Sequence, residues 1–410
     1  MTDELSGHTI GERIQALRER RGKSRPVVAG LVGKSPEWLK SIEKGRLLPP
    51  RWEMLCRLAD ALEVQDLSEL TGSAPDRVPM SPRTSHEVVP ALREAIEETT
   101  LFAAADPRPD PDDLQQRVAA AWQTWHTSSS PRAAAGAVLP QLLREGRRAT
   151  RVLDGAERRR AHAALSAAYA LSEQILAWVA DSSLLWLSAD RCMAAAEQSD
   201  DPEALAGASW VVGNVWRATG RETDAVQLVS DAAGLLEPHL NAAGDGGDRT
   251  RALWGACQLH ASITSARLGR EGDALRSLDH AWNMTGRLPS GYAHPWTLFG
   301  RANTAVTAVS VHVDLRKSSS ALDAAEQVDP DTVPSTDRRA RLWLETARAY
   351  HQRKDKTAAL HVLQRATQVS EESMRCHPLA RGIAGDLVTS GGGLVQTEAR
   401  GLAGRLGLTV

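Results

Sequence analysis

The fold of the first part of this chain is decided by residues 10–70, which read IGERIQALRERRGKSRPVVAGLVGKSPEWLKSIEKGRLLPPRWEMLCRLADALEVQDLSEL. Apolar residues recur three and four positions apart, as on one face of a helix. Ser24 and Ser35 stand where helix N-caps are expected, each with a proline soon after it. Glycines mark the expected helix ends, at Gly22, Gly33 and Gly45. The pattern predicts four helices followed by a short fifth helix at Leu67–Leu70.

The second and third of these segments are joined by a tight turn that contains Gly33, and the third segment opens with small polar residues. Two helices joined in this way make a helix-turn-helix. The second helix of such a pair enters the major groove of DNA, with its N-terminal residues at the base edges. The stretch therefore predicts contact with double-stranded DNA.

This stretch resembles the Cro/lambda-repressor-like family, the XRE-type helix-turn-helix, over about 60 of the 410 residues. The residues that carry the resemblance are Arg13, Ile14, Leu17, Arg18, Ala29, Gly33, Ser35, Leu39, the string Ile42-Glu43-Lys44-Gly45-Arg46, Pro49 and the run Leu55–Ala59. It implies a recognition helix at about Ser35–Lys44. It implies base contacts through Ser35, Glu37, Lys40 and Ser41. It implies phosphate contacts through Arg25, Lys44 and Arg46.

The resemblance also implies a structural pair, in which Arg18 and Glu43 meet between the first and third helices. The second helix departs from the family, which usually has polar residues where this chain has Val27, Gly30 and Leu31. These apolar residues either pack on another domain or remain exposed. A helix-turn-helix fold used for protein contact alone is therefore the alternative to DNA binding.

The charge of the chain is unevenly distributed. The net charge of the whole sequence is −2, but residues 1–51 hold 11 Lys and Arg against 6 Asp and Glu, a net charge of +5. The remaining residues hold 38 against 45, a net charge of −7. Because phosphate contact requires positive charge, this division favours DNA binding by the N-terminal part alone.

Composition and motifs indicate a protein that is neither an enzyme nor a membrane protein. The chain has no Walker loop, no zinc-protease motif and no nucleophile elbow. Its four cysteines fall at Cys56, Cys192, Cys257 and Cys376, outside any CxxC, so we expect reduced thiols, no metal site and no cofactor. No apolar signal region and no run of about 18 apolar residues is present, so we expect a cytoplasmic protein. Abundant Ala, Arg and Trp indicate a bacterial source with a high-GC genome.

Three regions are expected along the chain. Residues 1–72 form the helix-turn-helix domain, and residues 73–111 form a proline-marked linker that carries one amphipathic helix at Val88–Phe102. That helix either bridges the two domains or contributes to a dimer contact. Residues 112–410 are helical throughout, without a convincing strand.

The last region contains an internal repeat. Segments of similar pattern begin at Ala225, Ala274, Ala321 and Ala359, spaced by 49, 47 and 38 residues. Short glycine turns, at Gly220 and Gly269, precede the first two. The pattern resembles degenerate tetratricopeptide repeats and predicts an all-α fold whose body is an α-solenoid, with a globular helical bundle as the alternative.

A helix-turn-helix joined to such repeats is similar in architecture to the peptide-sensing quorum regulators of the tetratricopeptide class. That likeness implies a groove for a peptide or small-molecule effector, lined by the first helix of each repeat. The candidates for this site are tryptophans on predicted first helices and polar residues on the same helices. They are Trp210, Asn214, Trp254, Gln258, Arg301 and Asn303. Core packing is the alternative role for each tryptophan.

The sequence thus predicts a homodimeric transcriptional regulator with a DNA-binding N-terminal domain and a sensing or dimerising repeat domain. The alternative function is an interaction scaffold, whose repeats hold a protein partner and whose helix-turn-helix does not read DNA.

Overall fold

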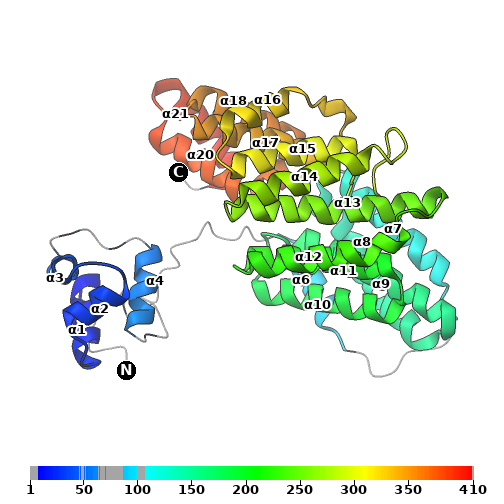
Figure 1. Ribbon diagram of the computed structural model, residues 1–410, viewed down its shortest axis with the longest axis horizontal. Coiled ribbons are helices and arrows are strands. Elements are labelled where there is room, and N and C mark those ends of the chain that lie inside the picture. Colours follow the sequence, from blue (N-terminus) through cyan, green and yellow to red (C-terminus); the bar gives the residue numbers. More distant parts are fainter. Residues whose placement is uncertain are drawn as a thin grey trace. The chain divides into compact units, whose positions relative to one another are not determined.

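The computed structural model describes residues 8–45, 47, 50, 52–62, 64, 70, 86–99 and 107–408. Every regular element in these ranges is a helix, as predicted (Figure 1). The chain divides into two compact units, residues 1–82 and 83–410, which we call the head and the body.

The head contains α1 (Ile10–Arg20), α2 (Arg25–Leu31), α3 (Pro36–Glu43) and α4 (Trp52–Ala61). The glycines after α1, α2 and α3 adopt positive φ angles of 61°, 68° and 65°, so they end these helices as predicted. A Cβ on Gly11 would lie 2.2 Å from the Ile42 carbonyl oxygen, so glycine allows α1 to approach α3 closely. The predicted fifth helix lies outside the described residues, apart from Leu70, which is buried.

The body is a row of antiparallel helix pairs that resembles tetratricopeptide repeats. Its helices are α6 (Val88–Glu97), α7 (Pro111–Thr127), α8 (Pro131–Val152), α9 (Gly155–Leu176), α10 (Ser182–Ser199), α11 (Pro202–Ala218), α12 (Glu222–Leu236), α13 (Gly244–Arg267), α14 (Glu271–Thr285), α15 (Arg301–Asp314), α16 (Ser318–Glu326), α17 (Thr336–Gln352), α18 (Lys356–Val369), α19 (Glu371–Cys376), α20 (Pro378–Ser390) and α21 (Gly393–Arg405), with short 3₁₀ helices at Glu237–His239 and Pro330–Thr332. From α7 to α18, each odd-numbered helix pairs with the next even-numbered one. The odd-numbered helices, the first helices of the repeats, also contact one another in sequence.

The sequence repeat and the structural repeat share one register. Each of the four pairs from α11 to α18 is joined by a turn with one residue at positive φ. These residues are Gly220, Gly269, Arg316 and Lys354. Five residues after each stands an alanine of the sequence repeat, and all four alanines are fully buried. The small side chain is what permits the paired helices to approach each other there.

The amphipathic helix predicted in the linker belongs to the body. Its apolar face, which includes Val88, Leu92 and Ile96, is buried in the same core as α8. A Cβ on Gly136 of α8 would lie 2.8 Å from Val88, so α6 and α8 touch closely. The structure therefore places α6 within a packed domain, and it ends α6 at Glu97.

The end of the row of repeats returns to its beginning. Glu372 of α19 accepts hydrogen bonds from the backbone nitrogens of Arg132 (2.7 Å) and Ala133 (3.0 Å), in the first turn of α8. It also accepts from His86 Nε2 at 3.2 Å, because His86 Nδ1 is occupied by the Val88 N–H. Thr336 Oγ1 of α17 donates to the Thr127 carbonyl of α7 at 3.3 Å. We call this junction the seam.

We predict that Glu372→Gln destabilises the body by about 2 kcal/mol near neutral pH, because a buried carboxylate bonded to three donors loses its charge. Burial opposes the ionisation of Glu372, but its hydrogen bonds outweigh burial and lower its pKa below the ordinary value. Ionised Glu372 therefore contributes stability above pH 4.5 that is lost as the pH falls through its folded pKa. Urea unfolding of both proteins should show a stability difference at pH 7 that shrinks toward pH 3.

The matched control is Glu371→Gln, one residue earlier, whose side chain is half exposed and pairs with Arg405. It should change stability by less than about 0.5 kcal/mol. Equal effects at the two positions would contradict the importance of the seam carboxylate.

Candidate nucleic-acid interface and effector site

The α3 helix presents one face to the head core and the opposite face to solvent. Leu39, Ile42 and Glu43 are buried. The residues predicted to contact bases lie on the other side: Ser35, Glu37 and Lys40 are exposed, and Ser41 is half-buried. Ser35 caps α3 by accepting from the Trp38 N–H at 3.1 Å, and Ser41 Oγ donates to the Glu37 carbonyl at 2.9 Å. The polar face of α3 is thus available to a partner.

One buried carboxylate fixes the position of α3. Glu43 Oε1 accepts from Arg18 Nε at 2.6 Å, and Glu43 Oε2 accepts from Arg18 Nη2 at 3.3 Å. Arg25 Nε donates to the same Oε2 at 2.5 Å. The Glu43 side chain is fully buried, and its hydrogen bonds raise the pKa of Arg18 above the ordinary value. Glu43 therefore ties α1, α2 and α3 together, and Arg18 takes the structural contact that the sequence predicts.

The predicted phosphate contacts are in different situations. Arg25 is about one-third exposed, and its Nε is bonded to Glu43. This internal ion pair therefore competes with phosphate for the Arg25 side chain. Lys44 is exposed, with Nζ 3.4 Å from Gln15 Oε1. Arg46 lies outside the described residues. On α2, Val27 and Leu31 are 51% and 63% exposed, so within the head they remain uncovered.

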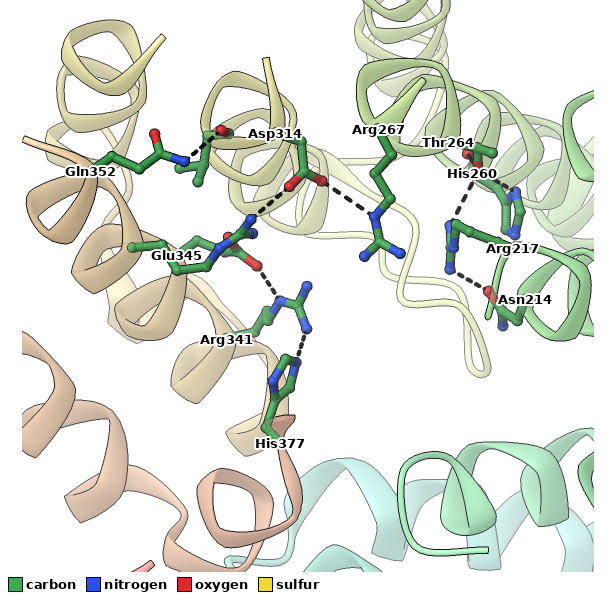
Figure 2. Close-up of polar contacts among 12 residues, drawn as sticks. Asn214, Arg217, His260, Thr264, Arg267, Asp314, Arg341, Glu345, Gln352 and His377 are labelled. Atoms are coloured by element: carbon green, nitrogen blue, oxygen red, sulfur yellow. Dashed lines mark hydrogen bonds and ion pairs between the residues drawn. The ribbon is translucent and has the colours of Figure 1, made fainter. Parts of the chain in front are cut away.

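In the body, the predicted effector residue Asn214 belongs to a polar network (Figure 2), and Trp210 contacts a histidine of the neighbouring helix. Asn214 Oδ1 of α11 accepts from Arg217 Nη2 at 2.7 Å, and Arg217 Nη1 donates to Thr264 Oγ1 of α13 at 3.4 Å. The Trp210 ring meets the His260 ring edge to face, with centroids 6.2 Å apart. The contact between α11 and α13 is therefore polar where these residues lie.

The other predicted effector residues make their contacts elsewhere. Trp254 of α13 lies against His280 of α14, and Arg301 lies over the ring of Trp282, also on α14. Asn303 is buried and donates to the Thr297 carbonyl at 3.3 Å, so its amide holds the loop before α15. Gln258 is half-buried, one helical turn after Trp254. These contacts favour packing roles over a shared ligand site for all but Trp210 and Asn214.

The charged residues that face one another on successive first helices are not among the residues predicted from the sequence. Asp314 of α15 bonds to Arg267 of α13 at 3.4 Å and to Arg348 of α17 at 2.8 Å (Figure 2). Glu345 bonds to Arg341 at 2.7 Å and also to Arg348. A signal for the first of these pairs was present. Arg267 and Asp314 both stand seven residues before a repeat alanine, so opposite charges occupy equivalent positions of adjacent repeats.

Glu173 of α9 adds a buried acid to this region. Burial raises the pKa of Glu173 to about 7, although hydrogen bonding from Gln174 and the positive charge of Arg217 act in the opposite direction. Gln174 Nε2 donates to Glu173 Oε2 at 2.6 Å. This carboxyl is therefore only partly ionised near neutral pH.

Among the described residues, no three His, Cys, Asp or Glu side chains gather in a way that could hold a metal ion. Cys192, Cys257 and Cys376 are buried free thiols, and burial raises the pKa of Cys192 and Cys257 to about 12. Within the described ranges, every helix is too short or too polar to cross a membrane.

We predict that Glu43→Gln lowers the local stability of the head by about 3 kcal/mol, because it leaves the buried Arg18 guanidinium with only the exposed Glu19 carboxylate as a counter-charge. Amide hydrogen exchange across residues 10–62 of the full chain measures this local stability. Glu37→Gln, an exposed position on the same helix, is the control and should leave exchange nearly unchanged. Equal protection in both variants would show that the ion pair does not hold α3.

We predict that Glu173→Gln removes a pH dependence from the stability of the body. The folded pKa of Glu173, about 7, lies above its ordinary value of 4.5, so the folded state binds more protons between these values. Its contribution to stability is full below pH 4.5 and is lost as the pH rises through 7, a change on the order of 3 kcal/mol. Urea unfolding measures the free energy of unfolding of both proteins at pH 5 and pH 8. Relative to the native protein, the variant should be more stable at pH 8 than at pH 5.

Glu197→Gln, an exposed position on α10, is the control for this comparison and should follow the native protein at both pH values. A Glu173→Gln variant with the native pH profile would contradict the partly protonated state.

Comparison with known proteins supports the assignment of the head. Residues 9–70 match the helix-turn-helix domain family, so the head is a helix-turn-helix domain. No curated protein sequence matches the chain. Among solved structures, yeast Tom70 aligns at 12% identity with a TM-score of 0.29, covering 95% of this chain and 88% of that chain. The hetero-tetramer Cut9–Hcn1 of the APC/C aligns at 13% identity with a TM-score of 0.23, covering 99% and 78%.

Proposed function

We propose that this protein is a sequence-specific DNA-binding transcriptional regulator, whose repeat body pairs two copies of the chain and senses a small effector. The observation that carries the proposal is the two-sided character of α3. Glu43 locks the inner side to α1 and α2, while Ser35, Glu37 and Lys40 stand exposed near the start of the helix. A rigidly held helix with polar residues at its N-terminal end has the form that reads the major groove.

The charge distribution supports the same proposal. Residues 1–51 carry a net charge of +5 and the rest of the chain carries −7. Phosphate attraction supplies much of the affinity of any DNA-binding protein, and it would act on the head and not on the body. We expect Lys44, exposed directly after α3, to contact a phosphate.

One observation favours a second candidate function. Val27 and Leu31 leave an apolar surface on α2, the helix that precedes the recognition helix. Exposed apolar residues of this kind often mark protein contacts. The second candidate is therefore a scaffold in which the head contacts a protein and does not read DNA. Salt-dependent DNA binding distinguishes the two.

We predict that Lys40→Ala weakens binding to the native operator by about 1–3 kcal/mol and relaxes base preference, because its side chain lies on the face expected to meet bases. Lys44→Ala and Arg46→Ala should weaken binding to all sequences alike, each reducing the salt slope by about 1. Gel-shift titrations of the full chain at several salt concentrations, on DNA first selected from a random pool, measure both effects.

Arg276→Ala is the control for loss of one positive charge, because Arg276 is exposed on α14 of the body and pairs with Asp273. Its DNA affinity should equal that of the native protein. If all three head variants also bind as the native protein does, the regulator proposal fails and the scaffold function is favoured.

We predict a homodimer, because a single head offers little surface to DNA and heads of this type act in pairs. The two half-sites should lie about one helical turn of DNA apart, or a multiple of it. Light scattering at micromolar protein, with and without the selected DNA, measures the mass. A monomeric mass in both conditions would rule out the dimer.

A further inference from the structure

Five arginines from three first helices face one region of the body, and we call them the arginine cluster. They are Arg217 of α11, Arg267 of α13, and Arg338, Arg341 and Arg348 of α17. Arg217 experiences the charges of Arg267 and Arg341, and Arg338 experiences that of Arg341. Figure 2 shows Arg217, Arg267 and Arg341 on separate helices around one space. Like charges from α11, α13 and α17 therefore lie within reach of one another.

The carboxylates of this region do not balance the cluster. Asp314 is shared by Arg267 and Arg348, and Glu345 is shared by Arg341 and Arg348. Asp337 attracts Arg338 but accepts a hydrogen bond from Ser373 Oγ at 2.8 Å. With Asp337 and the partly ionised Glu173 included, four carboxyl groups stand against five guanidinium groups. The excess is between one and two positive charges, on side chains that are half-buried except for the exposed Arg267.

Among the described residues, Arg217 has no ion-pair partner. Its hydrogen bonds go to the neutral oxygens of Asn214 and Thr264, and no carboxylate lies within the 4.0 Å of an ion pair. Burial and the charges of Arg267 and Arg341 lower the pKa of Arg217 to about 9. Glu173 and Asp314 act on Arg217 in the opposite direction, but Glu173 is only partly ionised at neutral pH and Asp314 is bonded to Arg267 and Arg348. The site would accept an external negative charge.

His377 indicates a missing acceptor at the other side of the cluster. Its Nδ1 accepts from the Leu379 N–H at 3.2 Å, so the proton of the neutral ring is on Nε2. Burial and nearby arginines hold the pKa of His377 well below its ordinary value, so the ring stays neutral. The Arg341 guanidinium meets this same Nε2, so a donor faces a donor. An anionic oxygen that approaches both groups from one side would accept from each.

We infer that the arginine cluster, with Asn214 and His377, binds a small ligand carrying carboxylate or phosphate groups. The flat guanidinium fork pairs with either group through two parallel hydrogen bonds, which makes this chemistry the natural counterpart of the cluster. The inference deepens the proposed sensor function, on which it rests for the role of the ligand. A ligand bonded to both Arg217 and Arg341 would favour the arrangement of the body in which α11 and α17 are closest.

The test uses the full chain and two probes, pyrophosphate and citrate, at an ionic strength held constant with sodium chloride. At least one probe should raise the melting temperature by several degrees along a saturating curve. Calorimetric titration of the same probe should give a dissociation constant that rises at least about tenfold in Arg217→Gln and in Arg338→Gln. Arg276→Gln, on the outer helix α14, should bind the probe as the native protein does.

Arg338→Gln is included because it should leave the fold intact, since Arg338 makes none of the ion pairs or hydrogen bonds described above. A second readout separates binding from structure. Without a probe, at low salt, Arg217→Gln should melt at or above the native temperature, because an uncompensated charge is removed. A structural arginine would instead lower the melting temperature when it is replaced.

Response to pyrophosphate alone assigns a phosphate ligand, and response to citrate alone assigns a carboxylate ligand. The inference is overturned if neither probe gives a saturating shift, or if Arg217→Gln and Arg338→Gln bind the probe with native affinity. DNA affinity of the same samples separates this failure from failure of the regulator. Normal DNA binding without anion binding removes the arginine site alone, whereas anion binding without DNA binding supports the site and removes the regulator.

Discussion

The body depends on one carboxylate, that of Glu372, which joins residues more than two hundred positions apart. The first N–H groups of a helix have no partner within the helix, and the helix dipole makes that end attractive to an anion. Glu372 supplies both the acceptor and the charge to α8. Because α19 is thereby held to α8, and α17 contacts α7, the late repeats stay beside the early ones. That closure is what allows Arg341 of α17 to lie near Arg217 of α11.

In the head, too, a buried carboxylate joins separate helices. Glu43 is fully buried and accepts three hydrogen bonds from Arg18 and Arg25, so it holds α3 against two other helices. In each unit the buried acid is fully engaged by donors, which is the condition under which a buried charge stabilises a fold. The consequence for function is that the recognition face of α3 is positioned by residues that need not touch DNA. The same holds for the first helices around the arginine cluster.

The local structure could be predicted from the sequence, because its causes are local. Glycine at the end of α2 and alanine five residues after Gly269 act through backbone angles and side-chain size, which a sequence pattern reveals. The seam could not be predicted, since nothing near Glu372 in the chain indicates His86 or Arg132. The predicted effector residues are in different surroundings. Asn214 lies beside the arginine cluster, while Asn303 holds a loop, and only the three-dimensional arrangement separates the two roles.

The seam also joins the helices around the arginine cluster to the start of the body. His86 is the first described residue of the body, and it donates to Glu372. The helix α17 carries three arginines of the cluster and contacts α7 at the seam. A ligand that draws α17 toward α11 would therefore act on a helix that takes part in the seam. Such a ligand changes DNA affinity only to the extent that it binds one arrangement of the seam more tightly than another, so the binding energy at the arginine cluster sets the upper limit of the response.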